Sequence, residues 1–279
     1  MATFVLNPIS MHLITLDEVP FEVLADTFDY AFSDYFVKFS NDPEKLKKRW
    51  ELGGANFALS AGLIQDNHLV GFLVNAIEER NGEMIAHNLA TGIIPEFRGE
   101  GGTGLMYGML GPMLAKQGVK KYSLEIITKN KWAVKAYENI GFQEVRTLVC
   151  LSADKVLAES DEEVKNESIS WEWVEKTLFN SSSWEQDLEK IKKNESEFEF
   201  LAISNAWLII QKHSGQVMFG GKNDDAKNAT LIPLFKAVEK KYSLVKWNNI
   251  DSSEQKLLGY LGSLGFKETF KQFEMLKIS

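Results

Sequence analysis

Glycines at positions 99, 101, 102 and 104 lie in one short stretch together with an arginine and a proline. The stretch reads Thr91-Gly-Ile-Ile-Pro-Glu-Phe-Arg-Gly-Glu-Gly-Gly-Thr-Gly104 and leads into an apolar run from Leu105 to Leu114. The β-branched residues predict a strand that ends at Pro95, and the apolar run predicts a helix. Glycines carry no side chains, so several backbone N–H groups at the start of this helix can converge on one anion. The pattern favours a phosphate group as ligand, and a tight turn without a ligand is the alternative.

A second group of polar residues follows after one predicted strand. It reads Asn130-Lys-Trp-Ala-Val-Lys-Ala-Tyr137-Glu-Asn-Ile-Gly141-Phe142. Asn130 is a good N-cap for a helix, and Gly141 suits the position after its last turn. Tyr137 follows Asn130 by two helical turns, so both side chains face the same side. A phenol at this place can donate a hydrogen bond or a proton, and a helix residue packed in the core is the alternative.

Both stretches are similar to motifs of one enzyme family. Arg98-Gly-Glu-Gly-Gly102 behind Pro95 resembles the acyl-CoA loop of the GNAT superfamily of N-acetyltransferases, Q/R-x-x-G-x-G/A, and the second stretch resembles its N-x-x-A-x-x-x-Y-x-x-x-G-F segment. The resemblance implies an α+β fold with a mixed, mostly antiparallel central sheet flanked by helices. It also implies acetyl-CoA as co-substrate and direct transfer of the acetyl group to a primary amine of a small molecule or peptide. One departure is Thr103, which stands where the family has its final Gly or Ala.

The resemblance also assigns roles to single residues. It implies that the backbone of Thr91 to Ile93 pairs with the pantetheine arm and that the glycine loop grips the pyrophosphate. Asn130 would lie beside the pantetheine, and the Tyr137 hydroxyl near the sulfur, as catalytic residue. The residues expected to bind the cofactor are Thr91, Gly92, Ile93, Arg98, Gly99, Glu100, Gly101, Gly102, Thr103, Gly104 and Asn130.

The general base and the acceptor contacts are less determined. Four side chains lie near the strands that would line the site and are not ranked: Glu78, Glu79, Glu83 and His87. Tyr30, Tyr35 and Trp50 are acceptor contacts by resemblance, because the family's first helices roof the acceptor site. Core packing is the alternative for this aromatic stripe. Cys150 is expected to be a small hydrophobic residue of a strand rather than a nucleophile.

Composition limits the remaining possibilities. The 279 residues exceed the usual size of one core, so two domains are expected. One cysteine and four scattered histidines argue against a disulfide framework and a metal site. The net charge of −8 argues against nucleic-acid binding, and the absence of a long apolar run argues against a membrane span, so a cytoplasmic protein is expected. Nothing in the sequence indicates an oligomeric state.

The two domains are expected at 1–152, the catalytic GNAT domain, and at 168–279, a degenerate GNAT-like copy. An acidic, polar stretch from 152 to 168 connects them. Lys120-Lys-Tyr-Ser-Leu124 recurs as 240–244, and Leu261-Gly-Ser-Leu-Gly-Phe266 echoes Tyr137 to Phe142. The copy has two aspartates at 224 and 225 where a phosphate loop would fall, so no acyl-CoA is expected there. Its tryptophans at 171, 173, 184 and 207 form either a core or an interdomain wall.

The predicted order of elements fits this reading. Strands are expected at 11–16, 57–65, 69–77, 84–94, 120–127 and 146–151, with a hairpin turn at Asp66-Asn67. Helices are expected at 21–36, 42–52, 103–117 and from Asn130 to Gly141, with a kink at Pro112. Two other functions remain open. Glu125 follows Gly104 at about the spacing of a ribose-binding carboxylate, which would suit a nicotinamide-dependent oxidoreductase. A non-catalytic acyl-CoA sensor would use both halves as a binding module.

Overall fold

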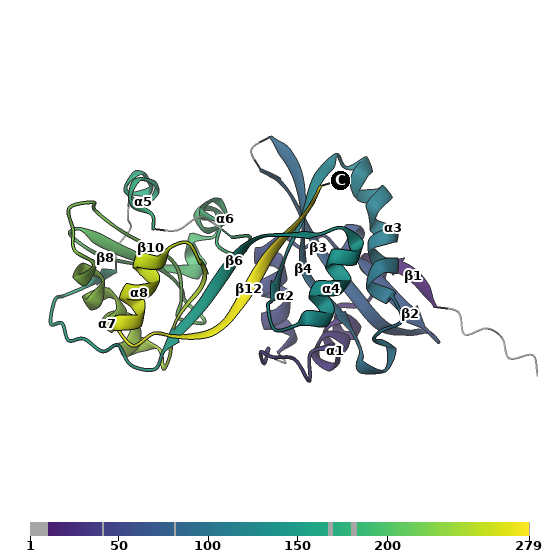
Figure 1. Ribbon diagram of the computed structural model, residues 1–279, viewed down its shortest axis with the longest axis horizontal. Coiled ribbons are helices and arrows are strands. Elements are labelled where there is room, and N and C mark those ends of the chain that lie inside the picture. Colours follow the sequence, from purple (N-terminus) through teal and green to yellow (C-terminus); the bar gives the residue numbers. More distant parts are fainter. Residues whose placement is uncertain (1–10, 41, 81, 167–169, 180–182, 279) are drawn as a thin grey trace, which may run out of the picture. The chain divides into compact units, whose positions relative to one another are not determined.

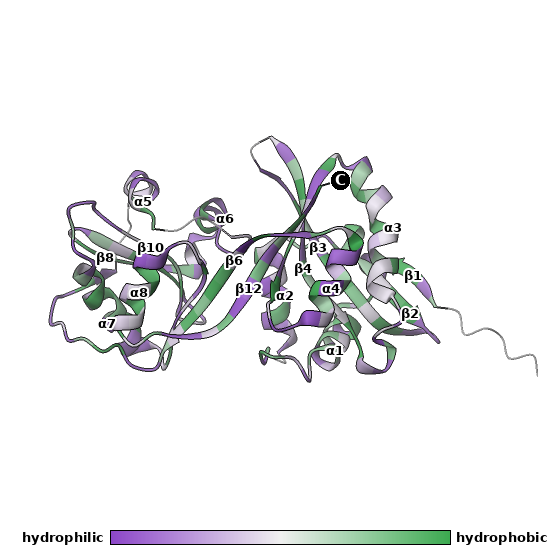
Figure 2. Cartoon of the chain, viewed as in Figure 1, coloured by the Kyte–Doolittle hydropathy of each residue, from purple (hydrophilic) through white to green (hydrophobic). Residues whose placement is uncertain are grey.

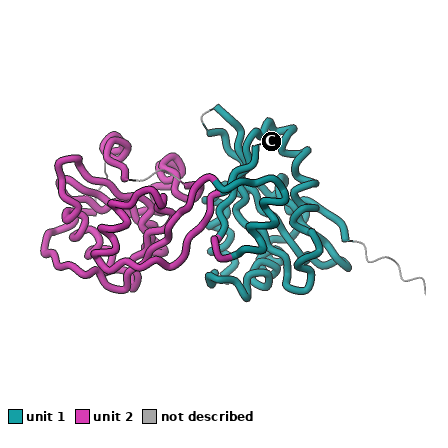
Figure 3. Tube along the Cα trace, viewed as in Figure 1, with its two compact units in different colours: residues 1–126, 130–144, 275–279 teal, residues 127–129, 145–274 magenta. Residues whose placement is uncertain are grey.

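The chain folds into two compact units. The computed structural model describes residues 11–40, 42–80, 82–166, 170–179 and 183–278. Unit 1 comprises residues 1–126, 130–144 and 275–279, and unit 2 comprises 127–129 and 145–274 (Figure 3). The predicted domains 1–152 and 168–279 are consecutive stretches of sequence. The units are not, because residues 127–129 belong to unit 2 and residues 275–279 belong to unit 1. Among the described residues, no helix is both long and apolar enough to cross a membrane.

Unit 1 is built on a sheet of five consecutive strands. They run in the order β1 (His12–Thr15), β2 (Ala61–Gln65), β3 (His68–Arg80), β4 (Glu83–Ile93) and β5 (Val119–Ile127). The first four are antiparallel neighbours, and β5 is parallel to β4. The β2–β3 turn falls at Asp66 and Asn67, whose φ angles of 50° and 62° suit a tight hairpin, as predicted. The mixed, mostly antiparallel sheet flanked by helices confirms the predicted fold class.

Helices cover both faces of this sheet (Figure 1). They are α1 (Phe21–Ala31), α2 (Pro43–Gly53), α3 (Gly102–Lys116) and α4 (Lys131–Ile140). Successive side chains at the end of β4 point to opposite faces of the sheet. Their contacts therefore show which helices lie on each face. A Cβ at Gly92 would meet Ala31 of α1, whereas Ile93 reaches Gly102 of α3. α1 and α2 therefore pack on one face and α3 and α4 on the other.

Two of the predicted boundaries in unit 1 are wrong. The first helix ends at Ala31 instead of Phe36, because the aromatic residues from Phe32 onward pack on one another: Phe32 stacks edge-on against Tyr35 and Phe39. The strand expected from Phe57 begins at Ala61, and Phe57–Leu59 forms a 3-10 turn (η2). The Asn56 side chain closes this turn by accepting from the Leu59 N–H. Two further 3-10 turns are η1 (Leu16–Glu18) and η3 (Pro95–Phe97).

Unit 2 has a sheet in the order β12-β6-β11-β10-β9-β8-β7. Its strands are β6 (Gln143–Ala153), β7 (Lys165–Asn166), β8 (Phe198–Ile203), β9 (Ala206–Gln211), β10 (Gln216–Lys222), β11 (Val245–Asp251) and β12 (Lys267–Ile278). Its helices and 3-10 turns are α5 (Trp171–Thr177), α6 (Leu188–Lys193), η4 (Glu195–Glu197), η5 (Asn228–Leu231), α7 (Ile232–Lys241) and α8 (Gln255–Ser263). The second half of β6 is hydrophobic (Figure 2) and supplies Val149, Leu151 and Ala153 to the core of this unit.

The two halves repeat one succession of elements. Strands β8, β9 and β10, helix α7, strand β11, helix α8 and strand β12 follow the same order as β2 to β6 with α3 and α4. Gly141 and Gly265 end α4 and α8 with φ angles of 103° and 93°, and a buried phenylalanine follows each. The repeated pentapeptide has different structures, however. In β5 it is strand, whereas Lys240 and Lys241 end α7 and the next strand begins only at Val245.

Several tryptophans and the cysteine that the sequence analysis considered are buried in unit 2. Trp207 is fully buried in one core cluster, and Trp171 and Trp173 pack against that cluster, so these three tryptophans are core residues. Trp184 is 3% exposed. Cys150 is fully buried in β6, as expected of a small hydrophobic residue. Part of the predicted connection, 154–164, carries neither helix nor strand. Its positions 167 and 168 lie outside the described residues.

Candidate active site

The glycine loop forms the start of α3, as predicted. Gly99 and Gly101 have φ angles of 85° and 80°, which a residue with a Cβ adopts only at a cost. Gly101 is the N-cap, so no side chain caps the helix. The first intrahelical bond runs from the Leu105 N–H to the Gly101 carbonyl, which leaves the N–H groups of the first turn without helical acceptors. A Cβ built at Gly99, Gly101 or Gly104 would meet nothing within 4 Å. The loop is open to a ligand, and its donors fit an anion.

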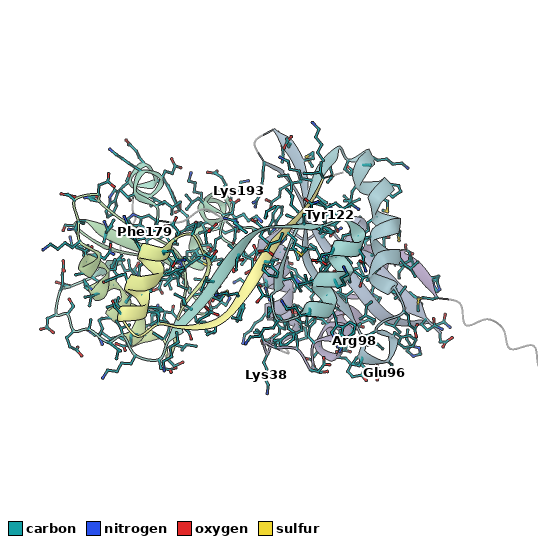
Figure 4. All side chains as sticks on the ribbon, viewed as in Figure 1. Lys38, Glu96, Arg98, Tyr122, Phe179 and Lys193 are labelled. Carbon is teal, nitrogen blue, oxygen red and sulfur yellow. The ribbon has the colours of Figure 1, made fainter. Side chains whose placement is uncertain are left out.

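Arg98 holds this loop against the end of α1. Its guanidinium donates to both carboxylate oxygens of Asp34 at 2.7 and 2.8 Å, to the Ala31 carbonyl at 2.9 Å and to the Ile93 carbonyl at 3.1 Å. The hydrogen bond from Arg98 lowers the pKa of the Asp34 carboxyl. Figure 4 labels Arg98 beside Glu96, and Glu96 accepts from the Tyr30 hydroxyl. Four of the five N–H groups of the guanidinium are therefore bonded within the chain. Cofactor binding by residue 98 stays a prediction.

β4 and β5 separate next to the loop. Their parallel ladder ends at Asn88↔Leu124, while β4 continues to Ile93. The Ile94 N–H donates to Val70 of β3. Because backbone groups alternate along a strand, the N–H groups of Thr91 and Ile93 point away from β3, toward the side where β5 has diverged. These are the amides predicted to pair with a pantetheine arm.

A β-bulge changes the direction of the side chains at this point. Val74 pairs with Ala90 and Asn75 with Asn88, so Leu89 is the extra residue of β4. Leu89 and Ala90 both pack against the α1 and α2 face. Asn88 and Thr91, three positions apart, thereby share the opposite face, and the Asn88 Nδ2 donates to the Thr91 Oγ1 at 2.6 Å.

Tyr137 reaches this face of β4 from α4. Its hydroxyl lies beside Thr91, and burial raises the pKa of Tyr137 to about 12. The ring is 7% exposed and packs edge-on against Tyr107 and Phe142. Tyr137 is thus both a core residue and a hydroxyl donor beside the separated strands.

Asn130 caps α4, as predicted, by accepting from the Ala133 N–H at 3.2 Å. It lies beside the Tyr35 side chain, whose pKa is raised by burial. Tyr35 lies close enough to Tyr137 for the two phenols to interact electrostatically. The segment after α1 therefore contributes a hydroxyl to the same site.

The candidate bases lie elsewhere. Glu78 pairs with Arg80 at 3.0 Å, and Glu83 pairs with Lys121 at 2.5 Å. Glu79 is exposed. His87 is buried on the face opposite to Asn88 and contacts the Ser123 Oγ through its Nδ1 at 2.8 Å. Within the described part of the chain, no three His, Cys, Asp or Glu side chains are grouped so as to hold a metal ion.

Comparisons with known proteins agree with this geometry. The sequence profile of the Acetyltransferase (GNAT) family matches residues 24–142, which contain the loop, the separated strands and Tyr137. This part of the chain belongs to the GNAT family. The family uses acetyl-CoA. No curated protein shows significant sequence similarity to the chain.

Solved GNAT structures resemble the whole chain in fold. A putative acetyltransferase from Pyrococcus horikoshii is 14% identical, with a TM-score of 0.66 over 97% of this chain and 89% of its own. A GCN5-related N-acetyltransferase from Sphaerobacter thermophilus is 12% identical, with a TM-score of 0.67 over 96% and 95%. A tandem GNAT protein from the clavulanic acid biosynthesis pathway is 9% identical, with a TM-score of 0.67 over 96% and 98%. Identities this low show the fold alone.

The GNAT-like half in unit 2 differs from unit 1 at two features of the site, the strand edge and the tyrosine. The β10–β11 ladder ends at Val217↔Trp247, but Leu178 then bridges to Gly221, and the Phe179 N–H donates to the Gly220 carbonyl at 3.0 Å. In unit 2 the segment at Leu178 and Phe179 thus occupies the edge of β10. The corresponding edge of β4 in unit 1 is available to a ligand. The position that corresponds to Tyr137 is Leu261, which has no hydroxyl.

Sequence reasoning missed several residues of the site. Asn88 donates to the Tyr107 hydroxyl, and Tyr122 packs against Tyr107. The signal for these residues was weak: an asparagine within an apolar strand, and tyrosines at apolar positions of α3 and β5. The bulge at Leu89, which aligns Asn88 with Thr91, has no signal in the sequence.

Proposed function

We propose that the chain is an N-acetyltransferase that moves the acetyl group of acetyl-CoA to a primary amine of a small molecule or peptide. The observation that carries this proposal is the conjunction within unit 1 of an open anion-binding loop, an available strand edge at Thr91 to Ile93, and the Tyr137 hydroxyl beside Thr91. Together the three features offer donors for the phosphates, for the pantetheine arm and for the sulfur of a CoA thioester. The family assignment supports acyl transfer over hydride transfer.

The residues have separate tasks in the proposed reaction. The N–H groups of the first turn of α3 bind the pyrophosphate, and the Thr91 and Ile93 amides bind the pantetheine. The neutral amine attacks the thioester carbonyl, the new C–N bond forms, and the C–S bond breaks. An amide of this strand edge donates to the carbonyl oxygen as its charge develops, and losing such a donor typically costs about 2.7–4 kcal/mol of barrier. The Tyr137 hydroxyl hydrogen-bonds the departing thiolate.

The strong elevation of the Tyr137 pKa determines what its hydroxyl does. A phenol with a pKa of about 12 is a weaker acid than an alkyl thiol, whose pKa is about 8.5. Complete proton transfer from Tyr137 to the thiolate is therefore uphill at neutral pH. Hydrogen-bond donation is the role that the energetics favour, and the proton that the amine loses is available to the thiolate afterwards.

The test is thiol release from acetyl-CoA in the presence of a panel of primary amines and peptides. The wild-type chain is expected to release CoA with at least one amine, and mass spectrometry should find the acetylated product. Tyr137→Phe should bind acetyl-CoA and lose most turnover. A non-catalytic sensor would release no thiol with any amine while it binds acetyl-CoA. A nicotinamide-dependent enzyme would be stabilised by NAD and not by acetyl-CoA.

A further inference from the structure

The Arg98 side chain joins three segments of unit 1 immediately before the glycine loop. It donates to the Asp34 carboxylate, to the Ala31 carbonyl at the end of α1 and to the Ile93 carbonyl at the end of β4. These bonds are 2.7 to 3.1 Å long, and the two to Asp34 form a bidentate pair between charged groups, the strongest kind that the side chain can make. The set is termed the Arg98 clamp.

The bond to Ile93 marks one end of the open edge of β4. The Ile94 N–H donates to Val70 on β3, so the backbone groups of Ile93 point away from β3. The Ile93 carbonyl accepts from the Arg98 Nε at 3.1 Å. The N–H groups of Thr91 and Ile93 lie on one side of this carbonyl, and the glycine loop begins on the other. The clamp therefore separates the edge assigned to the pantetheine arm from the loop assigned to the phosphates.

The bond to Ala31 uses a carbonyl that α1 leaves open. α1 ends at Ala31, and the last four carbonyls of a helix have no donor within it. The guanidinium at this position also meets the negative end of the helix dipole. Tyr30, in the last turn of α1, donates to Glu96, two residues before Arg98. The end of α1 thus holds the segment from Glu96 to Arg98 at two points.

The glycine loop depends on such an anchor, because its own side chains provide none. Gly99 and Gly101 have left-handed φ angles, and a Cβ at either position would meet nothing within 4 Å. Gly101 is the N-cap of α3 and offers no capping side chain. Glycine has more backbone freedom than any other residue, so an unsupported loop of this composition would order its N–H donors at a high entropic cost. Fixing the residue directly before Gly99 lowers that cost.

We propose that Arg98 and Asp34 are positioning residues for the phosphate-binding loop. The clamp holds the loop in the conformation in which the first-turn N–H groups of α3 face the pyrophosphate, so the inference rests on the proposed function. Direct contact between the guanidinium and a phosphate is the competing role, and the two roles differ in sign at Asp34. Removing that carboxylate releases two N–H groups and a negative charge, which would keep or strengthen a direct contact, whereas loss of positioning weakens binding.

Asp34→Asn and Asp34→Glu form the matched pair, and acetyl-CoA is the probe, titrated calorimetrically into the full chain. The asparagine variant should bind about threefold to tenfold more weakly, because the loop must then be ordered at the expense of binding energy. The glutamate variant keeps both oxygens and the charge and should bind within about twofold of the wild type. Asp29→Asn removes the same charge from the exposed side of α1 without touching the clamp, and should bind as the wild type does.

Hydrogen exchange supplies a readout that a merely structural role would not move. The side chains of Arg98 and Asp34 are 41% and 58% exposed, so their ion pair adds little to global stability. In the free chain, the amides of residues 99–105 should exchange faster in Asp34→Asn, while those of β9 in unit 2 exchange as in the wild type. Arg98→Lys keeps the charge, but one ammonium cannot bond three segments, so this variant should lose at least as much affinity.

Each unfavourable result would contradict a different claim. Wild-type or tighter binding in Asp34→Asn would overturn the inference and leave the proposed function intact. Equal weakening in Asp34→Asn and Asp29→Asn would also overturn it, because charge and not the clamp would then determine affinity. If Asp34→Asn does not fold, Arg98→Lys decides, and unchanged affinity and exchange there would overturn the inference. A wild type that does not bind acetyl-CoA would overturn the proposed function itself.

Discussion

Gly101→Ala tests the glycine loop with the least disturbance to the rest of the chain. Gly101 has a φ of 80°, and a Cβ there would meet nothing within 4 Å, so the substitution adds strain without a clash. An alanine in the left-handed region costs about 1–2 kcal/mol. Under the proposed function, the added methyl also enters the open space of the loop in which the phosphates would bind. Losing one hydrogen bond to a charged group, worth about 1.5–3 kcal/mol, lowers affinity about tenfold or more.

Gly108→Ala is the matched control on the same helix. Gly108 also has open space at its Cβ and lies within α3 with no left-handed φ. Alanine there should raise helix stability by about 1 kcal/mol. The same chemical change thus has opposite expected effects on stability at two positions seven residues apart.

The assays are chemical denaturation and calorimetric titration with acetyl-CoA. Gly101→Ala should unfold at lower denaturant concentration and bind about tenfold more weakly, whereas Gly108→Ala should unfold at higher concentration and bind as the wild type does. Wild-type affinity in Gly101→Ala would refute the assignment of this loop to the phosphates. An equal loss of affinity in both variants would mean that the helix as a whole, and not its first turn, determines binding.

Three further predictions follow from single contacts. Asn130→Ala removes the N-cap of α4 and should lower the free energy of unfolding by about 1 kcal/mol, measured by denaturant titration, and a change within error would contradict the capping role. Because Arg98 lowers the folded-state pKa of Asp34, this ion pair stabilises the fold above the unfolded carboxyl pKa of about 3.9 and loses that contribution as pH falls through the folded value. The Asp34→Asn variant should therefore show a smaller loss of stability than the wild type between about pH 5 and pH 3, and parallel curves would be inconsistent with the pair. Cys150 should resist alkylation in the native protein and react after unfolding, and rapid native labelling followed by mass spectrometry would show that β6 opens.

Local sequence rules predicted the elements around the site well, because those elements depend on local chemistry. Asn130 caps α4, Gly141 ends it with a left-handed φ, and Asp66-Asn67 makes the hairpin turn, each as its residue type requires. The loop before α3 likewise depends on glycines at positions that need positive φ.

Features that depend on tertiary pairing could not be predicted. The repeated pentapeptide is strand in one copy and helix end in the other, because neighbouring strands and not the five residues determine its structure. The bulge at Leu89 depends on the pairing of β3 with β4, and without it Asn88 and Thr91 would lie on opposite faces. The ion pair of Arg98 depends on Asp34, which is 64 positions away in the sequence.

The central claim is that unit 1 binds one acetyl-CoA through the first turn of α3 and the edge of β4. Calorimetric titration of the purified chain tests it most directly, because the stoichiometry reports on both halves. One equivalent per chain is expected, since the Leu178 segment already pairs with the corresponding edge in unit 2. Two equivalents would contradict the account of unit 2, and no binding at saturating acetyl-CoA would contradict the central claim.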